Sequence, residues 1–208
     1  MAAFVSPAIG AMNFGVEAVT KLLSNTYRVF CVIEIYNWTN DILTHPVVKV
    51  AGGKVEIPPT VILPGEKAIM VARKRSFTAT GSYGTVSWLI EGKHRRIVVM
   101  WTTPFNFDFY NNWLAVGITR NGVKEHAPGD TWYKEMYEGK ESSSLRFNRM
   151  KYQKDIEAVI HEEDGITILG TMSTGHQAQV KIIVRPVNTS HFGADIKAHF
   201  AEPLETEP

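Results

Sequence analysis

The stretch TTPFNFDFYNNWLAVG, residues 102–117, concentrates large aromatic side chains among turn-forming residues. Proline, asparagine and aspartate separate the rings, and these residue types favour turns, which lie at protein surfaces. Exposed rings can anchor a protein at a water–lipid interface, and clustered rings can enclose a quaternary ammonium such as choline by cation–π contact. The alternative is that the rings pack inward, because aromatic side chains are usually buried. The rings belong to Phe105, Phe107, Phe109, Tyr110 and Trp113.

A second aromatic group lies in the segment DTWYKEMYE, residues 130–138. Asp130 is a good N-cap residue, and the segment that follows it has helical composition. Tyr133 and Tyr137 are four residues apart, so they share one face of the predicted helix. Beside the aromatic loop, such a face would form a pocket for a choline headgroup.

The sequence lacks the local motifs of common active sites. It has no glycine-rich phosphate loop, no Gly-x-Ser-x-Gly elbow and no metal-ligand spacing among its seven histidines. The acidic run at 162–164 is interpreted as an ordinary turn. The single cysteine, Cys31, lies among aliphatic residues and is predicted to be a buried thiol in a strand. We therefore expect no enzymatic activity, no metal and no cofactor.

Composition and charge indicate a globular protein of one main domain. The chain has 208 residues, 44% of them apolar, and a net charge of +1. This balance argues against a dedicated nucleic-acid binder. Basic clusters at 73–75 and 93–96 are interpreted as solvated charges, with attraction to anionic headgroups as the alternative. No signal-peptide pattern and no spanning apolar run are visible, so we expect a secreted or soluble protein, with a cytoplasmic location left open.

Residues 4–23 carry the periodicity of an amphipathic helix. Apolar residues recur every three or four positions, and a narrower polar face runs alongside them. Pro7, Gly10 and Gly15 weaken the front of this helix. The apolar stripe includes Val5, Ile9, Met12, Val16 and Val19.

After residue 26 the pattern changes to short strands separated by turn signals. Strands are predicted at 27–38, 47–50, 68–72, 83–90, 95–101, 114–120, 156–161, 165–172 and 178–185. Such spacing is typical of a β-sandwich, here flanked by the N-terminal helix and the tyrosine-rich helix near 130–138. We divide the chain into a membrane-inserting segment at 1–26, a lipid-binding sandwich at 27–186 and a loose tail at 187–208.

Several stretches resemble the actinoporins, the pore-forming cytolysins first known from sea anemones. TTPFNFDFYNNWLAVGI resembles the family's aromatic loop, and WYKEMYEG resembles its tyrosine helix. VEIPPTVILPGEKAIMVARKRSFTATGSYG and GTMSTGHQAQVKIIVR resemble strand segments of the same family, and the amphipathic N-terminus stands in the family's order. The resemblance covers about residues 2–186, and it implies a β-sandwich flanked by two helices.

The resemblance also implies an activity and a set of site residues. The implied activity is binding of phosphocholine lipids, sphingomyelin preferred. A protein that is monomeric in solution would then oligomerise on the membrane and insert its N-terminal helix to form a cation-permeable pore. A non-lytic lipid- or glycan-binding module on the same fold is the alternative. Glu138 replaces one tyrosine of the family's helix, and Phe109 and Trp113 would anchor the loop in the interface. The implied phosphocholine-binding residues are Thr102, Pro104, Tyr110, Tyr133, Tyr137, Tyr83 and Val50.

Overall fold

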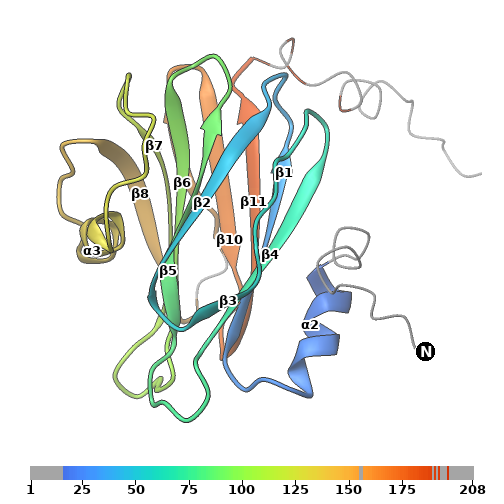
Figure 1. The fold of residues 1–208 in the computed structure, drawn as a ribbon, viewed down its shortest axis with the longest axis vertical. Helices are drawn as coiled ribbons and strands as arrows, with labels where there is room; N and C mark the ends of the chain where they lie inside the picture. The colour runs from blue at the N-terminus through green and yellow to red at the C-terminus, as the bar shows by residue number, and fades with distance from the viewer. Residues whose placement is uncertain (1–15, 155–156, 189, 191, 193–195, 197–208) are drawn as a thin grey trace, which may run out of the picture.

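The computed structural model describes residues 16–154, 157–188, 190, 192 and 196. Two β-sheets stack face to face, and one helix covers the outer face of each sheet (Figure 1). The predicted fold, mainly β with two flanking helices, is confirmed. The helices are α2, Val16–Ser24, and α3, Thr131–Glu138.

The first sheet has six strands in the order β3-β4-β1-β11-β10-β9. Strands β1 and β11 run parallel, whereas the other neighbours pair antiparallel. Together they carry α2 on their outer face. The strands are β3 (Lys54–Ile57), β4 (Lys67–Arg73), β1 (Phe30–Asn37), β11 (Gln177–Pro186), β10 (Ile166–Met172) and β9 (Val159–Glu163).

The second sheet has five antiparallel strands in the order β2-β5-β6-β7-β8. Its inner face meets the first sheet, and its outer face carries α3. The strands are β2 (Leu43–Gly52), β5 (Ser82–Ile90), β6 (Arg95–Thr103), β7 (Asn112–Thr119) and β8 (Leu145–Tyr152).

The main core lies between the two sheets. Strand residues alternate between the faces of a sheet, so every second residue of strands such as β11 turns inward. Trp88, Trp101 and Tyr152 are fully buried there. Cys31 is also fully buried, as predicted, and burial raises the pKa of its thiol to about 12. The core therefore needs no disulfide to hold the sheets together.

Two predicted details differ from the structure. Strands β3 and β8 were not expected from the sequence, because both lie at sheet edges and alternate weakly. In β8 only Leu145 and Tyr152, at its two ends, are buried, and charged residues occupy much of the rest. Strand β9 begins at Val159, and the expected start at 156 lies outside the described residues.

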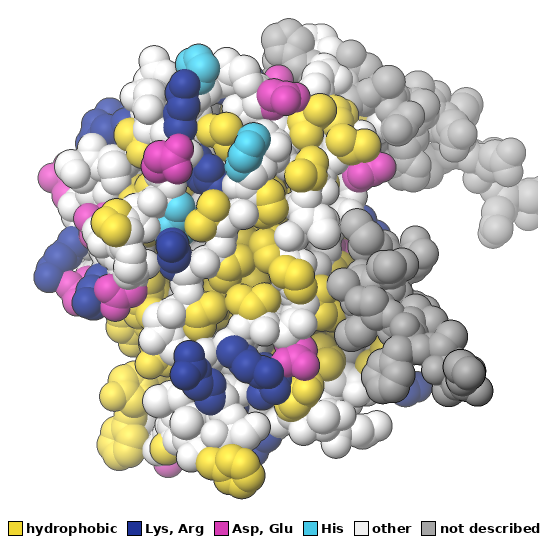
Figure 2. Space-filling view, viewed as in Figure 1, with side chains coloured by type: hydrophobic (Ala, Val, Ile, Leu, Met, Phe, Trp, Pro, Cys, Tyr) yellow, Lys and Arg dark blue, Asp and Glu magenta, His cyan; other side chains and the backbone are white. Residues whose placement is uncertain are grey.

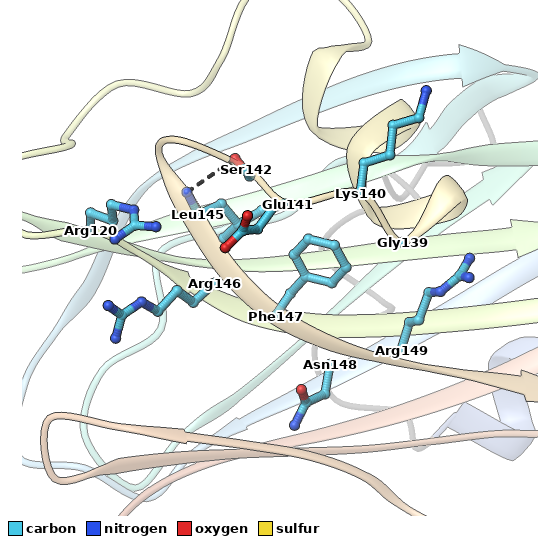
Figure 3. A pocket seen from close by; sticks show the side chains of 10 residues that line it. All are labelled: Arg120, Gly139, Lys140, Glu141, Ser142, Leu145, Arg146, Phe147, Asn148 and Arg149. Atoms are coloured by element: carbon cyan, nitrogen blue, oxygen red, sulfur yellow. Dashed lines mark hydrogen bonds between the residues drawn. The ribbon is translucent and has the colours of Figure 1, made fainter.

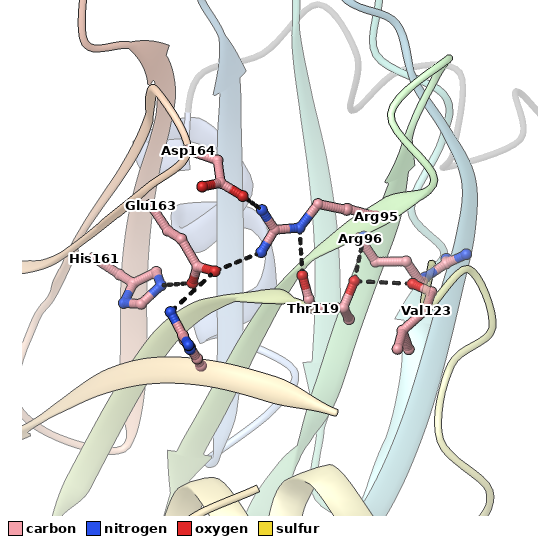
Figure 4. A network of polar contacts seen from close by, with 8 residues as sticks. Arg95, Arg96, Thr119, Val123, His161, Glu163 and Asp164 are labelled. Atoms are coloured by element: carbon pink, nitrogen blue, oxygen red, sulfur yellow. Dashed lines mark hydrogen bonds and ion pairs between the residues drawn. The ribbon is translucent and has the colours of Figure 1, made fainter. Parts of the chain in front are cut away.

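A buried arginine, Arg95, joins the two sheets (Figure 4). It begins strand β6, whose other end leads into the aromatic loop. Arg95 on β6 donates from Nη2 to Glu163 Oε1 at 2.7 Å and from Nε to the Thr119 carbonyl oxygen at 2.5 Å, and it also pairs with Asp164. Burial alone would raise the pKa of Glu163, but the hydrogen bond and charge of Arg95 hold it below its ordinary value. Removing one partner of such a buried pair typically costs about 3 to 5 kcal/mol.

Candidate functional site

The candidate site starts from one row of residues that crosses the five-stranded sheet. Strand register places Gly52 opposite Tyr83, Tyr83 opposite Thr102, and Thr102 opposite Trp113. Directly paired residues share a face of the sheet, so this row forms a continuous strip beneath α3. Large rings alternate with small residues along the row, and this alternation leaves a hollow above Thr102.

Gly52 makes room for the Tyr83 ring. A Cβ atom on Gly52 would lie 2.2 Å from Tyr83 Cζ, a distance at which the two atoms overlap. The tyrosine ring therefore occupies the space that any other residue at position 52 would fill.

Helix α3 adds two further tyrosines to this strip. Trp132 and Met136 point from α3 into the sheet and are fully buried against residues such as Met100. The next position after each of these puts Tyr133 on Tyr83, with ring centroids 5.3 Å apart, and Tyr137 on Tyr133 at 5.6 Å. Both pairs are stacked, so three tyrosines from two elements form one continuous aromatic wall.

A second set of contacts fixes the C-terminal end of α3. The helix stops at Gly139, whose φ of 70° lies in the left-handed region that favours glycine. The Arg149 guanidinium from β8 lies 4.7 Å from the centre of the Trp113 ring and donates to the carbonyl oxygen of Tyr137. Arg149 therefore positions the tyrosine helix, a role that no local pattern in the sequence indicates.

The N-terminal end of α3 differs from the prediction. Asp130 is the N-cap residue, but its side chain makes no capping hydrogen bond. Its carboxylate pairs instead with Lys134 at 3.1 Å. The hydroxyl of Thr131 donates to the Pro128 carbonyl oxygen and helps to set the turn that enters the helix.

A cleft of about 300 Å³ opens between α3, the sheet and the loops at one end of the sandwich. Six of the seven residues predicted for a phosphocholine pocket line it, and no ionised side chain does. Val50 does not line the cleft, because it pairs with Gly84, the residue after Tyr83, and therefore lies on the other face of the sheet. The lining residues are Ala79, Thr80, Gly81, Tyr83, Thr102, Pro104, Phe105, Asn106, Tyr110, Tyr133 and Tyr137.

The rings of the aromatic loop divide into inward and outward groups. Phe105 contacts two cations, those of Arg28 and Lys74, which are 5.4 and 5.2 Å from its ring centre. Phe107 packs edge-on against His176 at 4.6 Å.

Phe109 and Tyr110 point outward instead, with 80% and 55% of their surface exposed. Trp113 is half-buried beneath Tyr137 and Arg149. Each of the two interpretations of the loop therefore describes part of it.

The cleft offers neutral hydroxyls and ring surfaces. Burial raises the pKa of Tyr133 far above its ordinary value, so its hydroxyl stays protonated at physiological pH. Thr102 lies at the floor, 5% exposed. Within the described part of the chain, no group of three acidic, histidine or cysteine side chains could hold a metal ion. The arrangement suits a ligand that carries both a cation for the rings and an acceptor for the hydroxyls.

A larger hollow of about 490 Å³ lies along β8, beside the C-terminal end of α3 at Gly139 (Figure 3). Three of the four cations that line it have partners: Lys140 pairs with Glu138 at 2.5 Å, Arg146 lies 3.6 Å from Glu163, and Arg149 holds the end of α3. The fourth, Arg120, has a buried Nε without a hydrogen-bond partner among the described residues, but no aromatic wall faces it. We therefore favour the aromatic cleft as the site, since its polar atoms and rings converge on one space.

The predicted membrane-inserting segment is only partly described. Val5, Ile9 and Met12 lie outside the described residues, and Val16 begins α2. Val19 is buried, 4% exposed, where α2 packs on the six-stranded sheet. In the ranges that the structure describes, neither helix combines the length and the hydrophobicity needed to cross a membrane.

Comparisons with known proteins agree with this architecture. Tereporin-Ca1 from Terebra anilis is 44% identical over 171 residues, which cover 81% of this chain and 90% of the relative. Echotoxin-2 from Monoplex parthenopeus is 38% identical over 201 residues, which cover 92% of this chain and 72% of the relative. Conoporin-Cn1 from Conus consors is 32% identical over 199 residues, which cover 96% of this chain and 78% of the relative.

A solved structure and a family model extend the comparison. The crystal structure of the lipid binding protein Nakanori matches the fold with a TM-score of 0.64 at 15% identity, over 82% of this chain and 78% of that one. The family model described as sea anemone cytotoxic protein matches residues 14–185. The resemblance to the actinoporins is thereby confirmed, and the chain belongs to the sea anemone cytotoxic protein family.

Proposed function

We propose that this protein is a cytolysin that binds phosphocholine lipids, sphingomyelin preferred, oligomerises on the membrane and opens a cation-permeable pore. The cleft of neutral tyrosines carries this proposal, because its chemistry matches a zwitterionic headgroup. Family membership supports it, as do relatives named as toxins and porins. Until it meets a target-cell membrane, the protein would be a soluble, secreted monomer.

The two charges of a phosphocholine headgroup need different partners. The trimethylammonium group would lie against ring faces, each contact being worth about 0.5 to 2 kcal/mol. Tyr133 already stacks on two neighbours, whereas Tyr110 is the most exposed ring in the cleft. Tyr110 is therefore the ring that would close over the cation. The hydroxyl of Tyr133 would donate to the phosphate, and that of Thr102 would do so after turning away from Met100 Sδ, to which it donates at 3.6 Å.

One headgroup in such a cleft binds weakly, so further contacts must add to it. Phe109 is 80% exposed beside the cleft and would enter the lipid interface, with Trp113 behind it. Several copies on one membrane raise the effective affinity without any new contact. Oligomerisation would thus strengthen membrane binding as well as build the pore.

The N-terminal segment would supply the wall of the pore. A helix over residues 2–23 would be about 33 Å long at about 1.5 Å per residue, and a bilayer core is about 30 Å thick. Its polar residues would be costly in lipid if a single helix inserted alone. A ring of helices solves this problem by turning the polar faces of all copies toward water. This step requires α2 to leave the sheet on which Val19 packs.

Dye release from vesicles tests the proposal. We expect release from sphingomyelin-containing vesicles and little from vesicles that lack choline lipids. Tyr110→Ala should reduce binding and release together, whereas Tyr110→Phe should keep most of both because the ring remains. Ile160→Ala is the matched control, since Ile160 is 47% exposed on the edge strand β9. Equal release with and without choline lipids would overturn the headgroup assignment.

A covalent lock separates pore formation from binding. A disulfide between position 19 and a β1 residue of the same cluster would hold α2 on the sheet, because β1 lies close to α2. The locked protein should still sediment with choline vesicles but release no dye until it is reduced. Binding without release by the unmodified protein would instead support the non-lytic lipid-binding module, and glycan binding without vesicle binding would support the lectin-like one.

A further inference from the structure

The loop between β4 and β5, residues 74–81, presents a phenylalanine that the headgroup cleft does not use. Phe77 is fully exposed. Its φ of 59° places it in the left-handed region, which is unfavourable for a bulky aromatic residue. A bulky ring therefore stands in water on a backbone that would better suit glycine or asparagine.

Hydrogen bonds hold this loop in place, so the exposure of Phe77 does not result from a slack turn. The Lys74 ammonium donates to the Thr78 carbonyl oxygen at 2.6 Å. The Thr78 hydroxyl donates to the Arg75 carbonyl oxygen at 2.9 Å and lies 3.0 Å from the hydroxyl of Thr80. Arg75 reaches across to the Gly53 carbonyl oxygen at 3.0 Å. These bonds fix the loop on both sides of position 77 and leave the ring pointing outward.

The loop also forms part of the proposed lipid site. Its last three residues, 79–81, line the headgroup cleft. Ser82 pairs with Thr103, so this loop and the aromatic loop leave the sheet at the same end. Lys74 joins the two loops through its contact with the Phe105 ring. Hydrophobic side chains gather at that end of the molecule, the bottom of the view in Figure 2, close to basic ones.

We propose that Phe77 is a second membrane-penetrating tip, which enters the acyl-chain boundary of the bilayer whose headgroup occupies the cleft. The proposal rests on the proposed lipid-binding function and adds a contact that is indifferent to headgroup type. An exposed aromatic ring beside basic side chains is typical of segments that lie in a lipid interface. The cleft would then select the lipid, while Phe77 and Phe109 would add affinity from two separate loops.

A labelled cysteine tests where Phe77 lies in the bound state. Phe77→Cys can be labelled selectively with an environment-sensitive NBD dye, because Cys31 is fully buried. On sphingomyelin–phosphatidylcholine vesicles we expect brighter, blue-shifted emission, which acyl-chain nitroxide lipids quench. Val187→Cys is the matched control, since Val187 is 49% exposed and follows β11 at the opposite end of the sandwich. Its dye should not respond.

A second variant tests the contribution of the ring to affinity. Phe77→Asn removes the apolar ring and introduces a residue that tolerates positive φ. We expect vesicle partitioning to fall by about tenfold or more, as loss of a buried phenylalanine predicts, with an unchanged or raised thermal midpoint. Val187→Asn should change neither quantity.

Three results would overturn the inference, and they are distinguishable. If the labelled protein sediments with vesicles while the dye at position 77 stays in water, this inference fails and the proposed function stands. If the dye becomes shielded but lipid nitroxides do not quench it, Phe77 contacts another protein copy rather than lipid. If no vesicle binds the unmodified protein, the proposed function fails and the inference falls with it.

Discussion

Substituting Gly52 by alanine should disable the cleft without removing any side chain that lines it. The added Cβ would lie 2.2 Å from Tyr83 Cζ and 2.5 Å from Cε1. Ordinary contact between carbon atoms is about 3.5 to 4 Å, so the ring must move by more than about 1 Å. Tyr83 stacks on Tyr133 with centroids 5.3 Å apart, and this movement would break the first pair of the aromatic wall.

The size of the effect follows from the contacts that are lost. A stacked aromatic pair is worth about 0.5 to 1.5 kcal/mol beyond its buried area. A ring that no longer faces the ammonium group forfeits a cation–π contact of about 0.5 to 2 kcal/mol. Because the two losses overlap, we expect binding to phosphocholine vesicles to weaken by about 1 to 2 kcal/mol, or about fivefold to thirtyfold.

A double-mutant cycle measured by vesicle sedimentation checks this reasoning. Tyr83→Ala should weaken binding by a similar amount, and adding Gly52→Ala to it should have no further effect, because the clash disappears with the ring. Thermal unfolding of each variant controls for damage to the fold. If Gly52→Ala weakens binding equally with and without Tyr83, the effect comes from the backbone of β2. If Gly52→Ala by itself leaves binding unchanged, the aromatic wall does not hold the headgroup.

Two further predictions concern the parts that position the tyrosine helix. Arg149→Ala should lower the free energy of unfolding by about 1 to 2 kcal/mol and weaken vesicle binding. Arg149→Lys should restore only the charge at the helix end, because lysine has no planar group to stack on Trp113. Full rescue by lysine would contradict this. His126 packs against the Trp132 ring of α3, with ring centroids 4.4 Å apart, and burial lowers the pKa of its imidazole from 6.5 to about 4. The unfolded state therefore takes up the proton first, so the contribution of His126 to stability is complete above pH 6.5 and should be lost as the pH falls toward 4. Between pH 6.5 and 4, the thermal midpoint of His126→Gln should change less with pH than that of the unmodified protein. If both change equally, a group other than His126 takes up the proton on unfolding.

Much of the fold was visible in local patterns. Short hydrophobic strands with turn residues predicted the sandwich, and the spacing of Tyr133 and Tyr137 predicted that they share a helix face. Strand β8 was hidden because an edge strand needs little apolar alternation, and only its two ends are buried.

The candidate site was harder to predict, because its residues are brought together by strand pairing, which no local sequence pattern reveals. Tyr83 reaches Thr102 only through strand register, and a register shift after Val50 brings Gly52 rather than Ala51 opposite Tyr83. The role of Arg149 arises from the packing of β8 against α3, two elements whose relative placement no local pattern reveals. The sequence does not single out Phe77, because its exposure and its positive φ appear only in the folded chain.

The separation of the two helices explains how one domain could bind lipid and release its leading segment at the same time. Helix α2 packs on the outer face of the six-stranded sheet, and α3 packs on the outer face of the five-stranded one (Figure 1). Undocking α2 would expose the apolar cluster around Val19, but it would leave the stack of Tyr83, Tyr133 and Tyr137 untouched. The core between the sheets and the Arg95 ion pairs would hold the scaffold during that exchange. Because the exposed cluster would have to find apolar contacts again, release of α2 would be favourable only at a membrane or against another copy, and under the proposed function the cleft would bring the protein to that surface first.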